Sequence, residues 1–320
     1  MASPTDPEPP VPTPGTRGRS GQTILVALDG SAFGESALPH ARALARALEG
    51  PLHLVTVLNP GVTGGTADSS AECRLQRIES ERYLGQLARI LAAEGFEVSF
   101  EVREGDPAHE VVAAGLESGA GTVVVASRPR RETGRLVSRG VAQGVMAYGA
   151  MSLMVARGTG TIRWHRGSGP VHRRIAVGVD GSAASHRALE VAASLARSQD
   201  ARLVLIHVLP GGDGAVASPS SWSGPDGGAR RDFDEPGEAG RYLEELGSDL
   251  ENDAASVRTV LCRSAGVVEA VEEAAREEGG DLLVLGARGA GEAGARYGRC
   301  AHRLLLHAEL PVLVVRAERV

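Results

Sequence analysis

Continuous apolar runs alternate with longer amphipathic stretches along most of this chain. Runs without polar alternation are typical of strands covered on both faces, as in a parallel sheet flanked by helices. They predict five strands in each half of the chain, at residues 24–28, 52–58, 97–102, 122–127 and 152–156, and at 175–179, 203–209, 257–262, 282–287 and 312–317.

The stretches between the runs have the period of amphipathic helices. After the first run, apolar residues recur three and four positions apart from Ala37 to Leu48, and the stretch from Ala188 to Ala196 reproduces this stripe. Such a stripe buries one face of a helix on a sheet. A helix after each strand implies right-handed crossovers, so we expect a doubly wound α/β fold.

The two halves are repeats of one another. Asp29 and Asp180 lie 151 residues apart in matching Asp-Gly-Ser segments, and residues 82–84 (Arg-Tyr-Leu) recur 159 positions later at 241–243. An internal repeat of this length indicates a tandem architecture. The eight extra residues of the second half fall in a segment rich in Gly, Ser and Pro. For this segment a functional loop and disorder both stay open, with disorder favoured.

The repeat predicts two tandem five-stranded parallel-sheet domains. Residues 22–157 form the first and 173–318 the second, with a linker at 158–172. We expect a disordered Pro-rich tail at 1–21 and a mobile insertion at 211–240. A chain of 320 residues is long enough for each domain to bury its own core.

The composition narrows the range of partners. Aromatic residues make up only 3% of the chain, so Val, Leu, Ile and Ala must build the core. The net charge of -6 argues against a nucleic-acid-binding protein. Three cysteines without a Cys-x-x-Cys pair fit a reducing compartment. Because neither a signal peptide nor a bilayer-spanning run is recognisable, we expect a cytoplasmic protein with no membrane partner.

The repeated Asp-Gly-Ser segment follows the first strand of each half. An Asp in this position places a carboxylate at the carboxyl edge of the sheet, where open α/β sheets bind ligands. The same three residues also favour a simple turn, because Asp and Ser bond local amides and Gly adopts a positive φ. Both interpretations stay open at this point.

A glycine-rich loop follows the fourth strand of the second half. Gly286, Gly289, Gly291 and Gly294 lie in it, and Gly298 stands just before the last helix. Such a loop lets backbone amides approach a phosphate, and the helix start adds partial positive charge. Each charge–dipole contact contributes about 0.3–1 kcal/mol. Micromolar binding needs roughly 8 kcal/mol, so a pocket for a base must contribute as well.

Taken together, these motifs resemble the universal stress protein family. They are Asp-Gly-Ser after the first strand, a helix continuing as A-L-x-x-A, a second strand ending in His-Val, and Gly-x-x-Gly before a last helix and PVLVV. The resemblance covers residues 22–318 as two domains. It implies an adenine nucleotide alpha hydrolase-like fold with strand order 3-2-1-4-5, and ATP as the ligand, with Mg²⁺ left open.

The resemblance also implies which residues would contact the nucleotide in the second half. Asp180 is expected on the ribose. The remaining candidates lie at the strand ends and in the loop: Gly178, Val179, Val208, Leu285, Gly286, Gly289, Gly298, Arg299 and Cys300. The family pattern has nine residues between its second and third glycines and then Ser or Thr. This chain has eight between Gly289 and Gly298, and Arg299 follows.

The first half departs further from the family pattern. Ala126 and Pro129 occupy the two glycine positions, and Arg139-Gly140 stands in place of Gly-Ser/Thr. Pro129 has no amide hydrogen and a fixed φ. We therefore expect the first domain to retain Asp29, the equivalent candidate residue, but not ordinary ATP binding.

The resemblance implies an assembly as well. Family members often dimerise through their last strands, so residues 152–156 and 312–317 are expected to pair within one chain as a pseudo-dimer, with a homodimer left open. An enzyme is not expected, because the chain has no Gly-x-Ser-x-Gly elbow and no His-x-x-x-His helix motif. Three hypotheses remain: a stress-response regulator that binds ATP and an unidentified protein partner, a nucleotide-free scaffold, and slow ATP hydrolysis.

Overall fold

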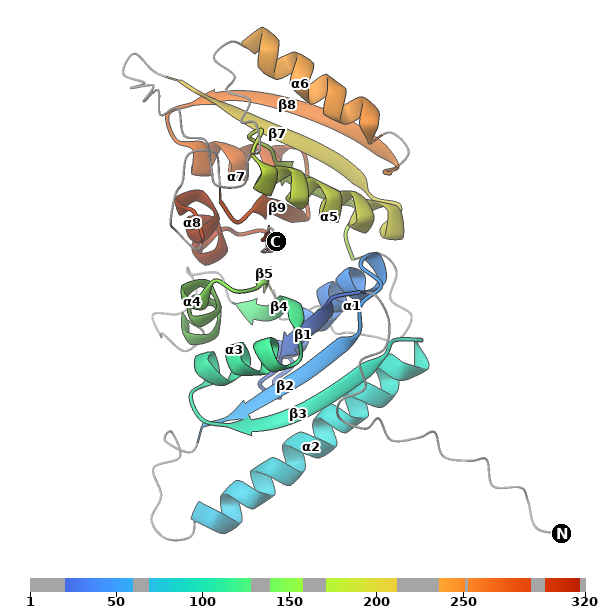
Figure 1. Cartoon of the computed structure of the whole chain (residues 1–320), viewed down its shortest axis with the longest axis vertical. Coiled ribbons are helices and arrows are strands. Elements are labelled where there is room, and N and C mark those ends of the chain that lie inside the picture. The colour runs from blue at the N-terminus through green and yellow to red at the C-terminus, as the bar shows by residue number, and fades with distance from the viewer. Residues whose placement is uncertain are drawn as a thin grey trace, which may run out of the picture.

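The computed structural model describes residues 21–59, 69–127, 139–157, 171–211, 236–250, 253–288 and 297–316. These residues form one continuous sheet of ten strands with helices on both faces (Figure 1). Each half of the chain contributes five strands. No helix among the described residues combines the length and apolarity that crossing a membrane requires.

The elements of the first half follow the predicted order. Its strands are β1 (Thr23–Ala27), β2 (Leu52–Leu58), β3 (Val98–Glu104), β4 (Ala120–Ser127) and β5 (Ser152–Arg157). Its helices are the 3₁₀ turn η1 (Gly34–Ser36), α1 (Ala37–Ala47), α2 (Ser69–Ala93), α3 (Pro107–Glu117) and α4 (Arg139–Tyr148).

The second half repeats this order. Its strands are β6 (Arg174–Gly178), β7 (Arg202–Pro210), β8 (Ser256–Ser264), β9 (Leu282–Gly286) and β10 (Val312–Val315). Its helices are α5 (Ala183–Gln199), α6 (Pro236–Asp249), α7 (Val267–Glu277) and α8 (Arg299–His307).

The sheet order is β3-β2-β1-β4-β5-β10-β9-β6-β7-β8. Within each half this is the order 3-2-1-4-5 with parallel pairing throughout, so the predicted fold class is confirmed. The helices form two layers, as Figure 1 shows: α1, α2, α5 and α6 cover one face, and α3, α4, α7 and α8 cover the other. The core is built from aliphatic side chains on both faces, as the composition predicts.

The two halves join along β5 and β10, which are antiparallel. Leu153 pairs with Val314, Met154 with Leu313, and Val155 with Val312. All of these side chains are buried. The predicted pairing of the two last strands within one chain is confirmed. A pseudo-twofold axis therefore passes between Met154 and Leu313 and relates one half to the other.

One predicted boundary is wrong. Helix α6 begins at Pro236, inside the segment 211–240 that we expected to be a mobile insertion. A stripe of apolar side chains holds this helix on the sheet: Ala239, Tyr242, Leu243 and Leu246. The Gly and Pro at its start concealed the amphipathic period that follows them. Residues 212–235 of the insertion, 1–20 of the tail and 158–170 of the linker lie outside the described residues.

Candidate functional site

The two Asp-Gly-Ser segments adopt the same turn. In the first, Oδ1 of Asp29 accepts hydrogen bonds from the Ser31 backbone N–H at 3.0 Å and from its hydroxyl at 2.6 Å. In the second, Oδ1 of Asp180 accepts the same two bonds from Ser182 at 3.0 and 2.6 Å. The intervening glycine has φ of 74° in both copies, a conformation that favours glycine. The local turn predicted from these residues is confirmed, and each turn fixes a carboxylate at the sheet edge.

The serine of each turn also receives a hydrogen bond from the chain that follows. Ser182 is the N-cap of α5, and its hydroxyl accepts from the Ser185 backbone N–H at 3.1 Å. Ser31 accepts from the Gly34 N–H at 2.9 Å, where the chain enters η1 instead of an α-helix. A Cβ on Gly34 would lie 2.3 Å from Oδ1 of Asp29, so this turn of the first half requires glycine.

The turn of the second half lies beside the end of β9. Strands β6 and β9 are parallel neighbours, and Ile175 pairs with Leu282. Their carboxyl ends, which lead to Asp180 and Gly286, therefore meet at one edge of the sheet. The Gly298 N–H donates to the Ala287 carbonyl at 2.7 Å, which fixes the start of α8 at the same edge. Gly289, the predicted centre of the phosphate loop, lies outside the described residues.

The start of α8 has the geometry of an anion site. Gly298 is its N-cap, with extended backbone and no side-chain cap. The first backbone amides of a helix point out of its end and carry partial positive charge. Arg299 is exposed and Cys300 is partly exposed at this end. These groups could receive a phosphate.

The residues predicted to contact the base and the ribose divide into two groups. Val179 and Leu285 are buried, whereas Val208 and Asp180 are partly exposed at the edge. The Gly286 backbone packs against the start of α5, where an added Cβ would lie 2.6 Å from the Ala184 carbonyl carbon. The glycine at 286 thus serves helix–sheet packing.

Sequence reasoning missed a residue that holds this edge together. His207 in β7 is buried, and its Nδ1 lies 2.7 Å from the Val179 carbonyl, to which it donates. The Val179 N–H donates to the Ile206 carbonyl at 2.9 Å. His207 therefore fixes the backbone immediately before Asp180. The only signal in the sequence is the histidine at the end of the second strand.

The electrostatics of the two turns differ. In the first half, burial raises the pKa of Tyr83 in α2 far above its ordinary value, and the charges of Glu35 and Asp29 raise it further. Glu35 and Tyr83 correspond to His186 and Tyr242 in the second half, where the two rings meet edge to face with centroids 6.4 Å apart. The first turn therefore has a second carboxylate close to it, where the second turn has an imidazole.

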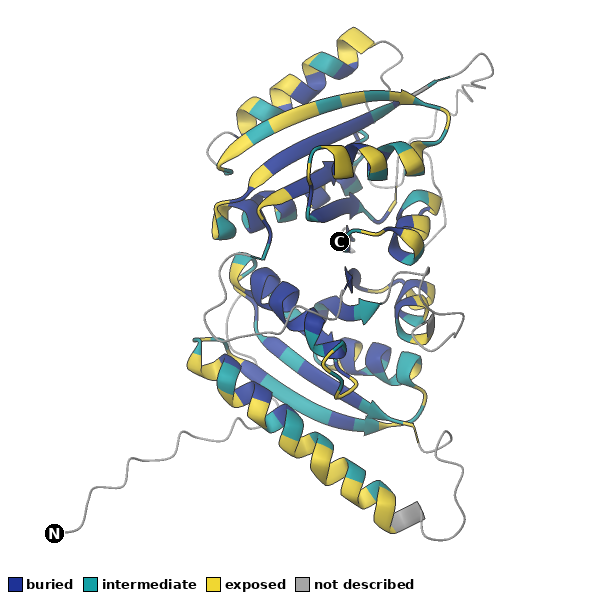
Figure 2. Ribbon diagram, turned by 180° about the vertical axis from the view of Figure 1, so that it is seen from behind, coloured by how far each residue is buried: buried dark blue, intermediate teal, exposed yellow. Residues whose placement is uncertain are grey.

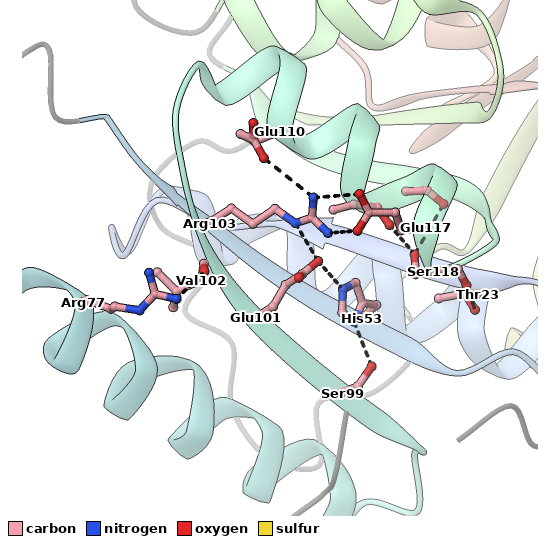
Figure 3. Close-up of polar contacts among 12 residues, drawn as sticks. Thr23, His53, Arg77, Ser99, Glu101, Val102, Arg103, Glu110, Glu117 and Ser118 are labelled. Atoms are coloured by element: carbon pink, nitrogen blue, oxygen red, sulfur yellow. Dashed lines mark hydrogen bonds and ion pairs between the residues drawn. The ribbon is translucent and has the colours of Figure 1, made fainter. Parts of the chain in front are cut away.

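A larger polar network lies away from this edge, between β2, β3 and α3 (Figure 3). Arg103 is its centre and forms ion pairs with Glu101 at 2.9 Å, Glu110 at 3.6 Å and Glu117. His53 connects Glu101, at 3.0 Å from its Nε2, to the Ser99 hydroxyl, at 2.8 Å from its Nδ1. The same carboxylate oxygen of Glu101 contacts both His53 and Arg103. This network therefore anchors α3 to β3, the outermost strand of the sheet on this side.

The fold defines the class: a tandem, doubly wound α/β protein with both domains in one sheet. The model of the universal stress protein family matches residues 21–157 and 172–316, and the chain belongs to this family. The family predicted from the sequence motifs is confirmed. A comparison with curated proteins found no match.

Solved structures share the arrangement of both domains. A universal stress protein from Archaeoglobus fulgidus DSM 4304 is 17% identical, with a TM-score of 0.64 over 92% of this chain and 98% of that chain. A functionally unknown protein from Pseudomonas aeruginosa PAO1 is 15% identical, with a TM-score of 0.57 over 93% of each chain. At these identities the similarity establishes the fold.

Proposed function

We propose that this protein is a stress-response regulator that binds ATP at the carboxyl edge of its second domain. The pairing of β6 with β9 supports the proposal, because it brings the Asp180 turn and the start of α8 to one edge. A ribose presents hydroxyl donors to a carboxylate, and a triphosphate presents charge to helix amides. The groups at this edge match both requirements.

The chemistry of the edge suggests a role for each group. Asp180 would accept hydrogen bonds from the ribose, and Val208 would contact the base. The Gly289 loop and the Cys300 amide, in the first turn of α8, would bind the phosphates, while the Gly298 N–H stays bonded to the Ala287 carbonyl. The exposed Arg299 guanidinium could pair bidentately with a phosphate, which a hydroxyl residue at this position could not do.

We propose a single ATP site per chain, located in the second domain. Glu35 and Asp29 both lie near Tyr83 in the first half, and two carboxylates there oppose the approach of a triphosphate. His186 replaces Glu35 in the second half. Pro129, in the first half, also removes an amide from the loop that would face the phosphates.

Titration calorimetry with ATP tests this assignment. We expect a stoichiometry of one ATP per chain. Asp180→Asn should weaken binding about tenfold or more, because it removes a charged hydrogen-bond acceptor while leaving an oxygen for Ser182. Asp29→Asn is the matched control and should bind like the unmodified protein. Two sites per chain, or equal losses in the two variants, would contradict the proposal.

The alternative function is a nucleotide-free scaffold. It is favoured by the seam between β5 and β10, which by itself unites the two domains in a single sheet. Thermal unfolding with ATP and Mg²⁺ separates the two functions. A ligand at one hundred times its dissociation constant adds about 2.7 kcal/mol to the free energy of unfolding. An unchanged melting temperature at millimolar ATP would support the scaffold.

A further inference from the structure

A histidine of the first domain meets a histidine at the end of the linker, in the interior of the interface between the two halves. His40 lies in α1, and His172 lies just before β6, 132 residues later. Nδ1 of His40 is 3.1 Å from Nε2 of His172, and the ring centroids are 4.9 Å apart. His40 is 5% exposed and His172 is 1% exposed. Figure 2 shows α1 buried along the interface between the halves.

The pseudo-twofold axis relates this contact to a second position that lacks it. Shifting His40 by the 151-residue repeat gives Val191, and Gly21 shifted by 151 gives His172. Gly21 and Val191 line a hollow of about 300 Å³ between the halves, together with Leu48. The same interface thus has a histidine pair on one side of the axis and an open hollow on the other.

The groups around His172 hold it in place. Its Nδ1 lies 3.5 Å from Oδ1 of Asp281, whose Oδ2 accepts from the Arg173 backbone N–H at 2.7 Å. The amide oxygen of Gln199 accepts from the N–H groups of Val171 and His172 at 2.8 and 3.0 Å. Asp281 can therefore balance one positive charge on the pair, from the side of His172.

The other charged groups of the elements around α1 interact elsewhere. The strands beneath α1 contribute apolar side chains to this part of the core. The charged groups with other partners are Arg42 and Arg46 with Glu94, Glu35 close to Tyr83, Arg187 with Glu190, and Arg197 with Asp253. No second carboxylate among these described groups faces the two rings.

The contact has room for one ring proton between the two nitrogens. If both rings were protonated, both nitrogens would carry hydrogens at 3.1 Å, and two positive charges would lie together in the core. Burial lowers the pKa of His40 well below its ordinary value of 6.5, and the charge of His172 lowers it further. The neutral form of His40 is thus the one that fits the folded interface.

We propose that His40 and His172 form an acid-sensitive latch between the two domains, closed while one ring is neutral and opened when both are protonated. The β5–β10 seam keeps the domains joined, so opening releases the His172 segment from α1 without separating the halves. The released segment leads directly into β6, the strand that carries Asp180. The latch thereby connects the acidity of the medium to the edge of the second domain.

The direction of the pH dependence follows from the lowered pKa of His40. Because the folded protein holds His40 neutral more strongly than the unfolded chain does, the unfolded or opened state binds more protons below pH 6.5. The latch therefore contributes its full stabilisation of the closed, folded state above that pH. This stabilisation is lost progressively as the pH falls below that value.

Hydrogen–deuterium exchange tests the latch at its own backbone amides. The N–H groups of residues 171–174 are hydrogen-bonded to Gln199 and Asp281 and report its closure. After correction for intrinsic exchange, we expect their protection to fall about tenfold or more between pH 7.5 and 5.0, as uptake of one proton allows tenfold per pH unit. The Ile24 N–H, bonded to the Pro51 carbonyl at 2.8 Å just after the equivalent position without histidine, should keep its protection.

Two variants test whether protonation of His40 causes the loss of protection at residues 171–174. His40→Phe keeps an aromatic ring but cannot be protonated, so protection at 171–174 should be equal at the two pH values. His302→Gln, a change at an exposed histidine of α8, should behave like the unmodified protein. If His40→Phe fails to fold, His40→Gln, whose side chain is polar but also cannot be protonated, gives the same expectation. Unchanged protection in the unmodified protein, or a persistent loss in either latch variant, would overturn the proposal.

Discussion

At the scale of single residues, the same three amino acids build the same turn twice, yet their surroundings give the two copies different chemistry. Asp29 and Asp180 accept identical pairs of hydrogen bonds. The difference comes from the residue six positions after each aspartate, a glutamate in the first half and His186 in the second. The repeat thus preserves the backbone and replaces a carboxylate by an imidazole, and for this reason our proposal places the nucleotide at the second turn.

A serine-to-alanine change measures what the turn contributes to stability. Ser182→Ala removes the N-cap of α5 and the hydroxyl that donates to Asp180, so the free energy of unfolding should fall by about 1 kcal/mol. Urea unfolding followed by circular dichroism gives the value. Ser248→Ala, at an exposed position in α6, is the control and should cost almost nothing. Equal losses would show that capping is not the cause.

At the scale of elements, the apolar runs predict all ten strands, but they do not distinguish central strands from edges. Strand β8 is an edge strand, and all of its residues are exposed or only partly buried. Strand β3, at the other edge, has a half-buried face that carries the polar network of Figure 3. Edge strands lack a neighbour on one side, so charged side chains can lie where a central strand requires apolar ones.

Arg103→Met tests how much this network stabilises the β3 edge. The hydrogen bond that Glu117 accepts from Arg103 holds the pKa of Glu117 below its usual value. The pKa of Glu101 is lowered as well, because hydrogen bonds from Arg103 and His53 outweigh the effect of burial. A carboxylate with a lowered pKa stabilises the fold above its unfolded pKa of about 4.3 and loses this effect as the pH falls. The variant should therefore lose stability at pH 7 and differ little from the unmodified protein near pH 3.

Urea midpoints at the two pH values provide the measurement. Arg197→Met is a suitable control, because Arg197 forms an exposed ion pair with Asp253 on the other half of the molecule. Exposed pairs contribute about 0–1 kcal/mol, so its midpoint should change little. A loss in Arg103→Met that is as large at pH 3 as at pH 7 would show that side-chain packing, and not charge, is responsible.

At the scale of the whole molecule, one antiparallel strand pair turns two domains into a single sheet. All four residues of β10 are buried in the full chain. In a separate second domain this strand would become an exposed apolar edge. Exposed edges of this kind pair with another chain.

The fragment 170–320 should therefore form a dimer through β10. Sedimentation equilibrium gives its mass, and the full chain provides the reference. Leu313→Arg in the fragment should yield a monomer, because it places two like charges together at the centre of the new pair. A well-behaved monomer of the unmodified fragment would show that the seam is dispensable for a folded second domain.

The sequence by itself determined the repeat, the fold class, the family and the pairing of the last strands. The repeat and the fold class follow from short-range patterns, namely apolar runs, helical spacing and turn residues at fixed offsets, whereas the pairing of the last strands follows from the resemblance to the family. Only the tertiary structure decided which side chains share an environment, such as His40 with His172 or Glu35 with Tyr83. Those neighbours come from segments far apart in the chain. Their protonation depends on burial and on nearby charge, and both arise only when the sheet and its helices have packed.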